Sequence, residues 1–462
     1  MSGNNLFEQA QSLQLQGKLV EAEAIYDDLL TQNHDNAGLL ATLGTLYLQL
    51  NKLGLAISLL ERSAKHMPSS DVLCNLGIAY KQSGQYQKCK ETFKRAMAHN
   101  PSADTAANYA ALFVNVGTPH DAISHAKRAL KIDAECPMAH WNMGIAELEI
   151  GKWDTAWDHH EYGFKTRPPM RIDRGANLNV PIWDGKSPGK VWIYGEQGIG
   201  DEIMFSSMIP DVLKTNDVIL ECNQRIEKLF SQSFDCECIG GREQNDVSWV
   251  ADKKPDWRIS IGSLGKFYRR TKESFTGEPY LKTDAVEKSG KFRVGISWVG
   301  GLKPGRVATR SVPIQRWESI FRNNCEFVSL QYTDCEDDLQ SIEKMGFKIE
   351  APHAAKAYEY NEVAKLVQSC DLVITICTSV VHLAGALGVP CWVMTPNKPA
   401  WRYGVEGKMP WYRSVRLYRQ PKEDDSWMPV ISRIGLDLEN LLDSQKRIYV
   451  PNMIQGEYRV AT

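Results

Sequence analysis

The chain has 462 residues, a formal net charge of −2 at pH 7, 43% hydrophobic and 24% charged residues. This length allows two or three domains with cores of their own, and the near-neutral charge excludes the broad basic surface of a nucleic-acid-binding protein. No apolar run approaches the roughly 20 residues of a membrane-spanning helix, and no signal peptide is recognised. The eleven cysteines lack metal-ligand spacing, so we expect reduced thiols in a cytoplasmic protein.

Residues 1–165 contain an internal repeat. Four pairs fall in register at a spacing of 33, namely Gly44 and Gly77, Tyr47 and Tyr80, Leu60 and Phe93, and Pro68 and Pro101. A small residue recurs at nearly the same period, at Ala22, Ala56, Cys89, Ala122 and Ala156. This pattern predicts pairs of antiparallel helices that approach closely at the small residues. We expect about five pairs, beginning near residues 3, 37, 70, 103 and 137.

The period and the L-G-x-x-Y…A…F…P pattern of these units resemble the tetratricopeptide repeat. The resemblance implies an α-solenoid, in which stacked helix pairs form a concave surface that binds a peptide or another protein. A spacer or dimerisation arm is the alternative. The pattern alone does not identify groove residues.

Residues 166–190 are rich in proline and glycine and lack a helical period, which predicts a linker. Beyond them, short apolar segments alternate with helical patterns in two series, 191–285 and 290–462. The first series contains "KVWIYG", "DVILEC" and "DWRISIGSL", and the second contains "FRVGISWVG", "EFVSLQY", "DLVITI" and "PCWVMT". Such alternation predicts two parallel sheets covered by helices, with ligands beyond the carboxyl ends of the strands.

The stretch "GEQGIGDEIMF", residues 195–205, places a glycine turn between a strand and a helix. Its glycine spacing matches neither a dinucleotide fingerprint nor a P-loop. The candidate cleft residues in this turn are Glu196, Gln197, Gly198 and Gly200. Asp201 stands where we expect the helix to begin, and an acid there stabilises a helix by about 0.3–1 kcal/mol through its dipole.

A second turn lies in "DLVITICTSVVHLAGALGVP". We expect a strand ending at Ile376 and a helix from Ser379 to Gly388, stopped by the following proline. Thr378 and Ser379 can cap this helix, whose free N–H groups and dipole favour an anion. The alternative is a capped helix in an α/β core with no ligand.

Four segments in order, "GEQGIGDEIMF", "VGISWVGG…TRSVPIQRW", "CTSVVHLAGALGVP" and "WYRSVRLYRQ", resemble the heptosyltransferase-like glycosyltransferases. The chain is most similar to a bacterial branch of this family, akin to glycosyltransferase family 9, that carries tetratricopeptide repeats at its amino end. The resemblance runs from about residue 181 to 420. It implies an α-solenoid followed by a GT-B fold of two Rossmann-like α/β domains, with 191–285 on the acceptor side and 290–462 on the nucleotide-sugar side.

The resemblance also implies roles for single residues. Asp201 matches the catalytic base that takes the acceptor's proton, with Glu196 and Glu202 as rival bases and helix stabilisation as the alternative role. Arg310 matches a basic position that faces the donor phosphates. The remaining donor-site candidates are Gly300, Thr378, Ser379, His382, Lys398 and Arg402. His382 has packing as an equal alternative, and the loop around Lys398 and Arg402 has a plain surface role.

One position departs from the family pattern. Family members commonly carry an acid directly before the "TS" pair, where this chain has Cys377. A thiol does not replace the charged hydrogen bonds of a carboxylate, so the donor sugar differs, another side chain supplies the bond, or activity has been lost.

The sequence therefore predicts an inverting, metal-independent glycosyltransferase without a cofactor. Its donor is a nucleotide-sugar, its acceptor is a protein or a saccharide, and its repeats recruit the acceptor or a protein partner. Oligomerisation stays open. The main alternative is a catalytically degenerate scaffold for protein assembly, and a sugar-nucleotide epimerase is the third interpretation.

Overall fold

The computed structural model describes residues 3–288, 290–301, 310–322, 324–421 and 426–449. The chain divides into two compact units, Met1–Met170 and Arg171–Thr462. The predicted linker, residues 166–190, straddles this boundary.

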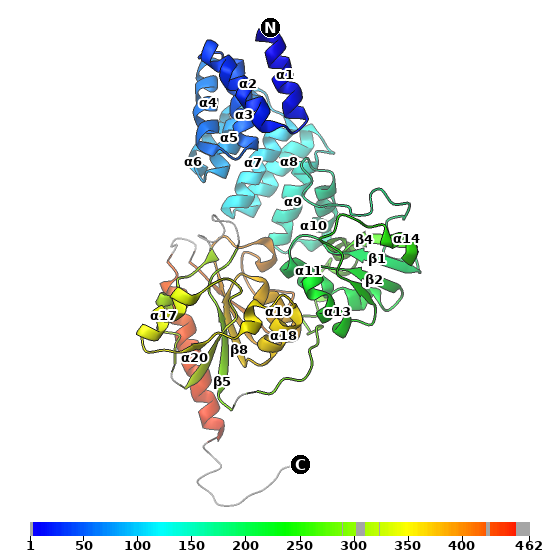
Figure 1. Ribbon diagram of the computed structural model, residues 1–462, viewed down its shortest axis with the longest axis vertical. Coiled ribbons are helices and arrows are strands. Elements are labelled where there is room, and N and C mark those ends of the chain that lie inside the picture. Colours follow the sequence, from blue (N-terminus) through cyan, green and yellow to red (C-terminus); the bar gives the residue numbers. More distant parts are fainter. Residues whose placement is uncertain (1–2, 289, 302–309, 323, 422–425, 450–462) are drawn as a thin grey trace, which may run out of the picture. The chain divides into compact units, whose positions relative to one another are not determined.

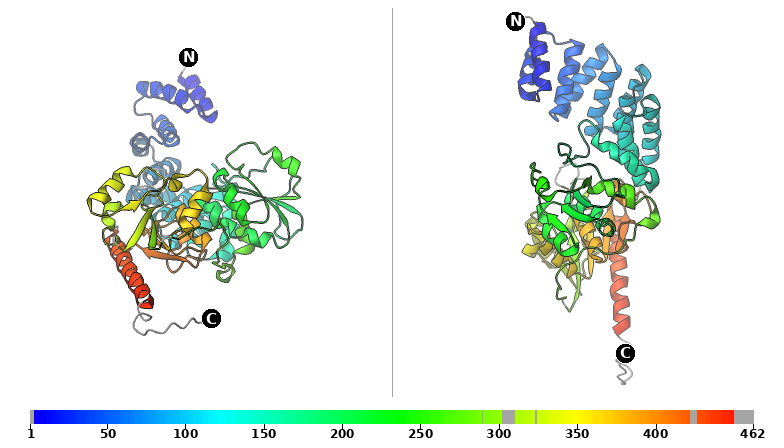
Figure 2. Two further views of the ribbon diagram at one scale, coloured as in Figure 1. Left: turned by 60° about the horizontal axis from the view of Figure 1, so that its bottom comes forward. Right: turned by 90° about the vertical axis from the view of Figure 1, so that its right-hand side faces the viewer.

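The first unit consists of five pairs of antiparallel helices that stack in a row (Figures 1 and 2). The pairs begin at the five positions that the period predicts. The helices are α1 (Gly3–Leu15), α2 (Leu19–Gln32), α3 (Ala37–Gln49), α4 (Leu53–His66), α5 (Ser70–Gln82), α6 (Tyr86–His99), α7 (Ala103–Val116), α8 (Pro119–Ile132), α9 (Pro137–Glu149) and α10 (Trp153–His160).

Small residues at the helix crossings explain this packing. Ala22, Ala56, Cys89, Ala122 and Ala156 are all fully buried. A Cβ on Gly144 would lie 2.8 Å from the backbone nitrogen of His160, so α9 and α10 touch through their main chains there. Side-chain caps begin several helices, because the first N–H groups of a helix need outside acceptors. Asn36, Ser69 and Ser102 accept from the backbone of α3, α5 and α7.

The second unit contains two parallel sheets. The first has the order β3-β2-β1-β4 and the second the order β10-β9-β8-β5-β6-β7. The strands are β1 (Lys190–Tyr194), β2 (Asp217–Glu221), β3 (Glu237–Ile239), β4 (Trp257–Ser260), β5 (Phe292–Ser297), β6 (Cys325–Ser329), β7 (Ile349–Glu350), β8 (Leu372–Ile376), β9 (Cys391–Thr395) and β10 (Val415–Arg419). The two sheets confirm the parallel α/β architecture predicted for this part of the chain.

Helices join and cover these strands (Figure 1). The α-helices are α11 (Ile199–Ser206), α12 (Ile209–Val212), α13 (Glu227–Ser233), α14 (Trp249–Lys253), α15 (Gly265–Tyr268), α17 (Glu336–Lys344), α18 (Tyr360–Gln368), α19 (Ser379–Leu387) and α20 (Met428–Tyr449). Short 3₁₀ turns include η3 (Ile261–Leu264), η5 (Ile314–Trp317) and η7 (Trp401–Tyr403). The strand end at Ile376 and the helix from Ser379, closed by Gly388 in the left-handed conformation, match the prediction.

Two predicted helices differ from the structure. The helix expected from Asp201 begins earlier, at Ile199, and ends at Ser206, because Gly198 and not Asp201 occupies the cap position. The alternating pattern of the second series also predicts a helix in "PIQRWESIFRN". Of this segment, residues 313–322 are described, and they form only the 3₁₀ turn η5, whose apolar residues Ile314 and Trp317 are fully buried. Of the helices in the described part of the chain, none has both the length and the apolar content needed to cross a bilayer. All eleven cysteines are free thiols.

Candidate functional site

The two sheets each reverse strand order at one place, and both places carry the sequence motifs. In the first sheet the reversal separates β1 from β4, and the glycine turn follows β1. In the second it separates β5 from β8, and Cys377 and Thr378 follow β8. Ligands of open α/β sheets bind beyond the carboxyl ends of the strands at such switch points.

The helices that leave these two switch points pack against each other. α11 contacts α19, and a Cβ on Gly200 would lie 3.3 Å from Ser379 Cα and 3.1 Å from the ring of His382. Glycine at position 200 therefore permits the amino ends of the two helices to meet. Gly198 has φ −107° and an open surrounding, so its glycine is not required by space or conformation.

Asp201 forms an ion pair with Arg402. Its Oδ1 atom contacts Nη2 of Arg402, and its Oδ2 atom accepts a weak hydrogen bond from Gly198 N at 3.4 Å. The two side chains are 16% and 15% exposed. Asp201 therefore lies at the junction of the two halves with a guanidinium engaging its carboxylate.

Arg402 sits on η7, which several contacts hold in place. Arg419 of β10 donates to the carbonyl oxygens of Tyr403 and Gly404 at 2.6 and 2.9 Å. Trp401 stacks on Phe205 of α11 with ring centroids 6.3 Å apart. Burial lowers the pKa of Arg402, the charge of Asp201 raises it, and the net shift is upward.

Arg310 and Gly300 lie at the switch point of the second sheet. A Cβ on Gly300 would meet Thr378 Cγ2 at 3.3 Å and Arg310 Cβ at 3.6 Å, so the two turns adjoin. The charges of both Arg310 and Arg402 act on Cys377, which places two cations beside the end of β8. Residues 302–309, the centre of the predicted donor motif, lie outside the described residues.

Cys377 faces the protein interior. Its side chain is 6% exposed and its thiol donates to the carbonyl oxygen of Met394 at 3.8 Å. Burial raises the pKa of this thiol to about 11, against the opposing charge of Arg310. The position at which the family resemblance implies an acid therefore holds a neutral, packed side chain.

The three residues of the second turn have separate roles. Thr378 caps α19 by accepting from Val380 N. Ser379 Oγ lies 2.5 Å from the hydroxyl of Tyr360. His382 is 3% exposed, its Nδ1 lies 3.2 Å from the hydroxyl of Tyr412, and burial lowers its pKa well below the ordinary value. His382 is thus a neutral packing residue whose ring edge lies at Gly200.

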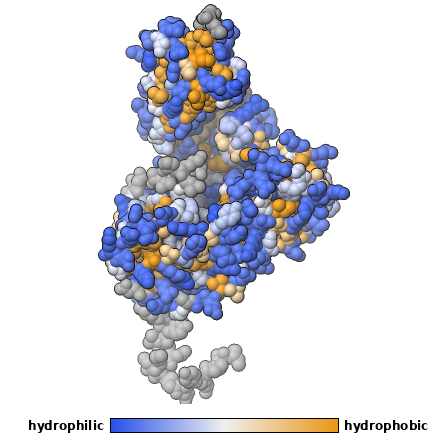
Figure 3. All heavy atoms as spheres, in the orientation of Figure 1, coloured by the Kyte–Doolittle hydropathy of each residue, from blue (hydrophilic) through white to orange (hydrophobic). Residues whose placement is uncertain are grey.

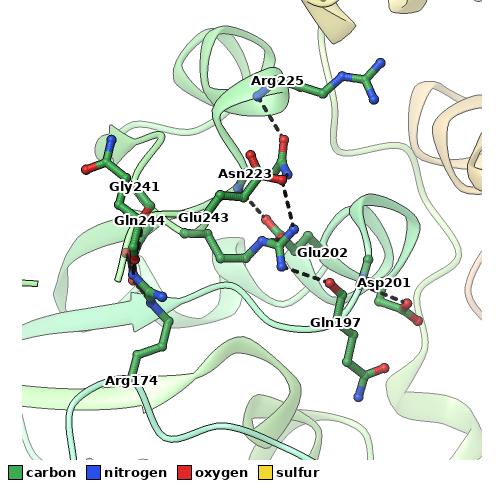
Figure 4. Close-up of polar contacts among 12 residues, drawn as sticks. Arg174, Gln197, Asp201, Glu202, Asn223, Arg225, Gly241, Glu243 and Gln244 are labelled. Carbon is green, nitrogen blue, oxygen red and sulfur yellow. Dashed lines mark hydrogen bonds and ion pairs between the residues drawn. The ribbon is translucent and has the colours of Figure 1, made fainter. Parts of the chain in front are cut away.

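The rival bases Glu196 and Glu202 each form a buried ion pair with an arginine. Glu196 is 6% exposed and binds Arg171 through both oxygens, at 2.7 and 2.9 Å. Glu202 is fully buried, pairs with Arg242 and accepts from Asn223 N at 2.8 Å. Figure 4 shows Glu202 turned toward Asn223 and Asp201 turned away from this network. Burial raises the pKa of Glu202 to about 8, against the opposing charge of Arg242.

Arginines from outside the motifs shape the glycine turn. Arg242 donates to the carbonyl oxygen of Gln197 at 2.9 Å, which holds Gln197 at a φ of +65°. Arg174 binds Glu221 at the end of β2 through both oxygens. It also donates to the carbonyl oxygens of Gly241 and Gln244 (Figure 4). Sequence reasoning missed Arg171, Arg174 and Arg242, since arginines in a proline- and glycine-rich segment or a loop carry no periodic signal.

Gln331, after β6, is a further residue that sequence reasoning missed. Its Oε1 atom accepts from Ser297 Oγ, Trp298 N and Val299 N, each at 3.1 Å. These bonds fix the turn after β5 that leads to Gly300.

Lys398 follows β9 and is exposed. The described residues contain no cluster of three or more side chains able to hold a metal ion.

The repeat unit has a groove of its own, with a volume of about 930 Å³. Its walls carry acids in the first turns of α5 and α7, Asp71 and Asp104, and bases in the segment after α10, Lys165 and Arg167. The other lining residues are Cys74, Asn75, Ile78, Ser102, Thr105, Asn108, Pro137, Met138 and Thr166. Figure 3 shows apolar residues among the first helices. Exposed apolar side chains of α1, α2 and α4 include Leu15, Val20 and Leu55.

Comparisons with known proteins identify the repeats. The tetratricopeptide repeat model matches residues 70–103, which form α5 and α6. The chain is 28% identical over 329 residues to Protein FlbA of Caulobacter vibrioides (strain ATCC 19089 / CIP 103742 / CB 15). That alignment covers 64% of this chain and 54% of FlbA, so the chain spans about half the length of the curated relative that it matches.

Three solved structures that resemble this chain each align with little more than a third of it. The MamA protein is 18% identical and aligns with a TM-score of 0.32, over 39% of this chain and 97% of its own. A thermophilic tetratricopeptide repeat protein of Thermus thermophilus is 18% identical with a TM-score of 0.33, over 36% and 92%. One from Parabacteroides merdae ATCC 43184 is 20% identical with a TM-score of 0.31, over 36% and 67%.

Proposed function

We propose that the protein is an inverting glycosyltransferase that uses a nucleotide-sugar, with a GT-B arrangement of its two sheets. One observation carries the proposal: the switch points of the two sheets adjoin through Gly200 and Ser379, and Asp201 from one half meets Arg402 from the other. A group transfer between two bound substrates needs such a junction, since both must be held in one geometry. The family resemblance of the motifs at both switch points supports the same class.

In the proposed reaction, the half with the first sheet accepts the acceptor's proton, and the half with the second sheet stabilises the leaving diphosphate. An acceptor hydroxyl gives its proton to Asp201 as its oxygen forms a bond to the anomeric carbon of the donor sugar. The bond from that carbon to the diphosphate breaks, and its electron pair leaves with the nucleoside diphosphate. Arg310, Arg402 and the amino end of α19 offer positive charge to the departing diphosphate.

The repeats supply the second part of the proposal, recruitment of a protein acceptor or partner. The support is the groove on α5, α7 and α9, which has acids near one set of helix ends and bases in the following segment. Groups of both signs along a groove favour an extended peptide that carries complementary charges. Cytoplasmic location and the choice between protein and saccharide belong to this proposal as well.

A nucleotide-binding experiment tests the donor site. Thermal unfolding is followed with UDP, GDP, ADP, CMP and dTDP, each with and without a sugar. A ligand at 100 times its dissociation constant stabilises the fold by about 2.7 kcal/mol. We expect the nucleotides of one nucleobase to raise Tm selectively and the variant Arg310→Ala to abolish this rise. Arg413 is an exposed arginine that pairs with Glu278 away from the turn, so the control variant Arg413→Ala should retain the rise. A chain that responds to none of these compounds contradicts the proposal.

A scaffold without turnover is the second candidate, and Cys377 is the observation that favours it. The packed thiol cannot bind a donor hydroxyl as an acid does. A chain that binds a nucleotide-sugar yet releases no nucleoside diphosphate with any acceptor would favour this candidate.

A further inference from the structure

We propose that Arg402 is shared between Asp201 and the donor diphosphate, so that Asp201 becomes available as a base only after the donor has bound. This inference rests on the proposed function and goes beyond it by assigning an order of events to one side chain.

The present contact uses only part of the guanidinium. Arg402 contacts one oxygen of Asp201 through Nη2. Among the described residues, the buried Nε atom of Arg402 has no hydrogen-bond partner. A guanidinium prefers to bind two oxygens through two parallel N–H groups, and a buried donor without an acceptor is destabilising. The pair is therefore an incomplete arrangement that a better acceptor can replace.

A diphosphate is the better acceptor at this place. It offers several oxygens and more negative charge than one carboxylate, and it matches the planar fork of arginine. The amino end of α19 and Arg310, both beside the end of β8, favour the same anion. Arg402 can satisfy Nε and one Nη together by turning from Asp201 to such a ligand.

When Arg402 turns to the diphosphate, the contacts of the Asp201 carboxylate change. While Arg402 is paired with Asp201, its guanidinium occupies Oδ1, the oxygen that an acceptor hydroxyl has to reach. Once Arg402 leaves, the remaining contact is the 3.4 Å hydrogen bond from Gly198 N. The freed Oδ1 atom then faces the junction, where an acceptor hydroxyl delivers its proton. The order of binding is thus donor first, acceptor second.

Isothermal titration with inorganic pyrophosphate tests the exchange without knowledge of the sugar or the base. Asp201→Asn is nearly isosteric and removes the competing charge. We expect it to tighten pyrophosphate binding by about tenfold, a typical size for the coupling of two sites. Arg402→Gln should weaken binding, and Asp201→Asn should have no further effect in the Arg402→Gln background, because the two changes then act on one contact.

A matched control separates exchange from general electrostatics. Glu406 is an exposed acid whose charge acts on Arg419, beside the same turn. Glu406→Gln removes one negative charge without touching the Asp201 pair, and we expect less than a twofold change. Melting curves check folding, and Asp201→Ser replaces Asp201→Asn if the latter does not fold.

The outcomes separate this inference from the proposed function. Tightening by Asp201→Asn that disappears in the double variant supports the exchange, including the case in which wild type binds no pyrophosphate and the variant does. Equal affinity of wild type and Asp201→Asn, equal tightening in both backgrounds, or equal tightening by Glu406→Gln overturns it while the donor site stands. If neither wild type nor any variant binds pyrophosphate or a nucleoside diphosphate, both proposals fail.

Discussion

The repeat unit, residues 1–170, and the sheet unit, residues 171–462, differ in how far apart in the sequence their bonded polar residues lie. In the repeats, a buried side chain bonds to the neighbouring repeat, as Asn142 does to the carbonyl oxygen of Ala107, 35 residues away. In the sheets, charged pairs join distant segments, and Asp201 meets Arg402 across 201 residues. The stability of the repeats therefore depends on close backbone packing repeated locally, and that of the candidate site on ion pairs that only the complete fold creates.

The largest expected effect comes from breaking one of these ion pairs. Arg171 is nearly fully buried and binds Glu196, Ser260 and Ser263. Arg171→Ala leaves the Glu196 carboxylate buried without a partner, which costs about 3–5 kcal/mol for pairs of this kind. Urea unfolding of the full chain measures the loss in the sheet unit.

The double variant Arg171→Met with Glu196→Leu sharpens that measurement. Replacing both charges by apolar groups removes the uncompensated charge, so we expect most of the stability to return. If the single and double variants unfold at the same urea concentration, the pair does not act as a unit.

Close packing in the repeats gives the next effect. Gly144→Ala places a methyl group 2.8 Å from the backbone nitrogen of His160, and overpacking of this kind destabilises by about 1–3 kcal/mol. Gly54→Ala is the matched control, because a Cβ on this helical glycine meets nothing within 4 Å and alanine favours a helix by up to about 1 kcal/mol. Opposite shifts in the urea midpoint of the repeat unit are expected. Shifts of the same sign contradict the packing argument.

The same contrast explains what the sequence could predict. Gly77 and Ala56 recur at a fixed period, so the helix pairs and their first residues follow from local pattern. The parallel sheets also follow, because strands such as Leu372–Ile376 are short, fully buried and apolar except for Thr375. The turns carrying Asp201 and Thr378 were identified from their motifs.

Pairing within the site could not be predicted in this way. Nothing in the residues around Asp201 indicates Arg402, and nothing around Glu196 indicates Arg171, because each partner arrives through the topology of the sheets. The partner changes the interpretation of each side chain. Asp201 was weighed as a base and is engaged by a guanidinium, and Glu196 and Glu202 were weighed as rival bases although both lie in buried ion pairs. The role of an acid at such a junction depends on which cation the fold delivers to it.

A buried acid of the repeats provides a pH-dependent effect and a direct contrast with Glu196. Glu149 on α9 is 4% exposed, and burial raises its pKa from 4.5 to about 7. Its native carboxyl keeps a proton at pH values where the unfolded chain has already lost it. Stability from this group is therefore complete below about pH 4.5 and declines as pH rises toward 7, by at most about 1.4 kcal/mol per pH unit for one proton.

Glu149→Gln should flatten this decline in the melting temperature of the repeat unit between pH 5 and 7.5, since an amide does not titrate. Glu149→Leu should flatten it equally, with a different stability at low pH. If either variant keeps the slope of the wild type, another group causes the pH dependence, and the contrast between a buried acid without a cation and one held by an arginine loses its support.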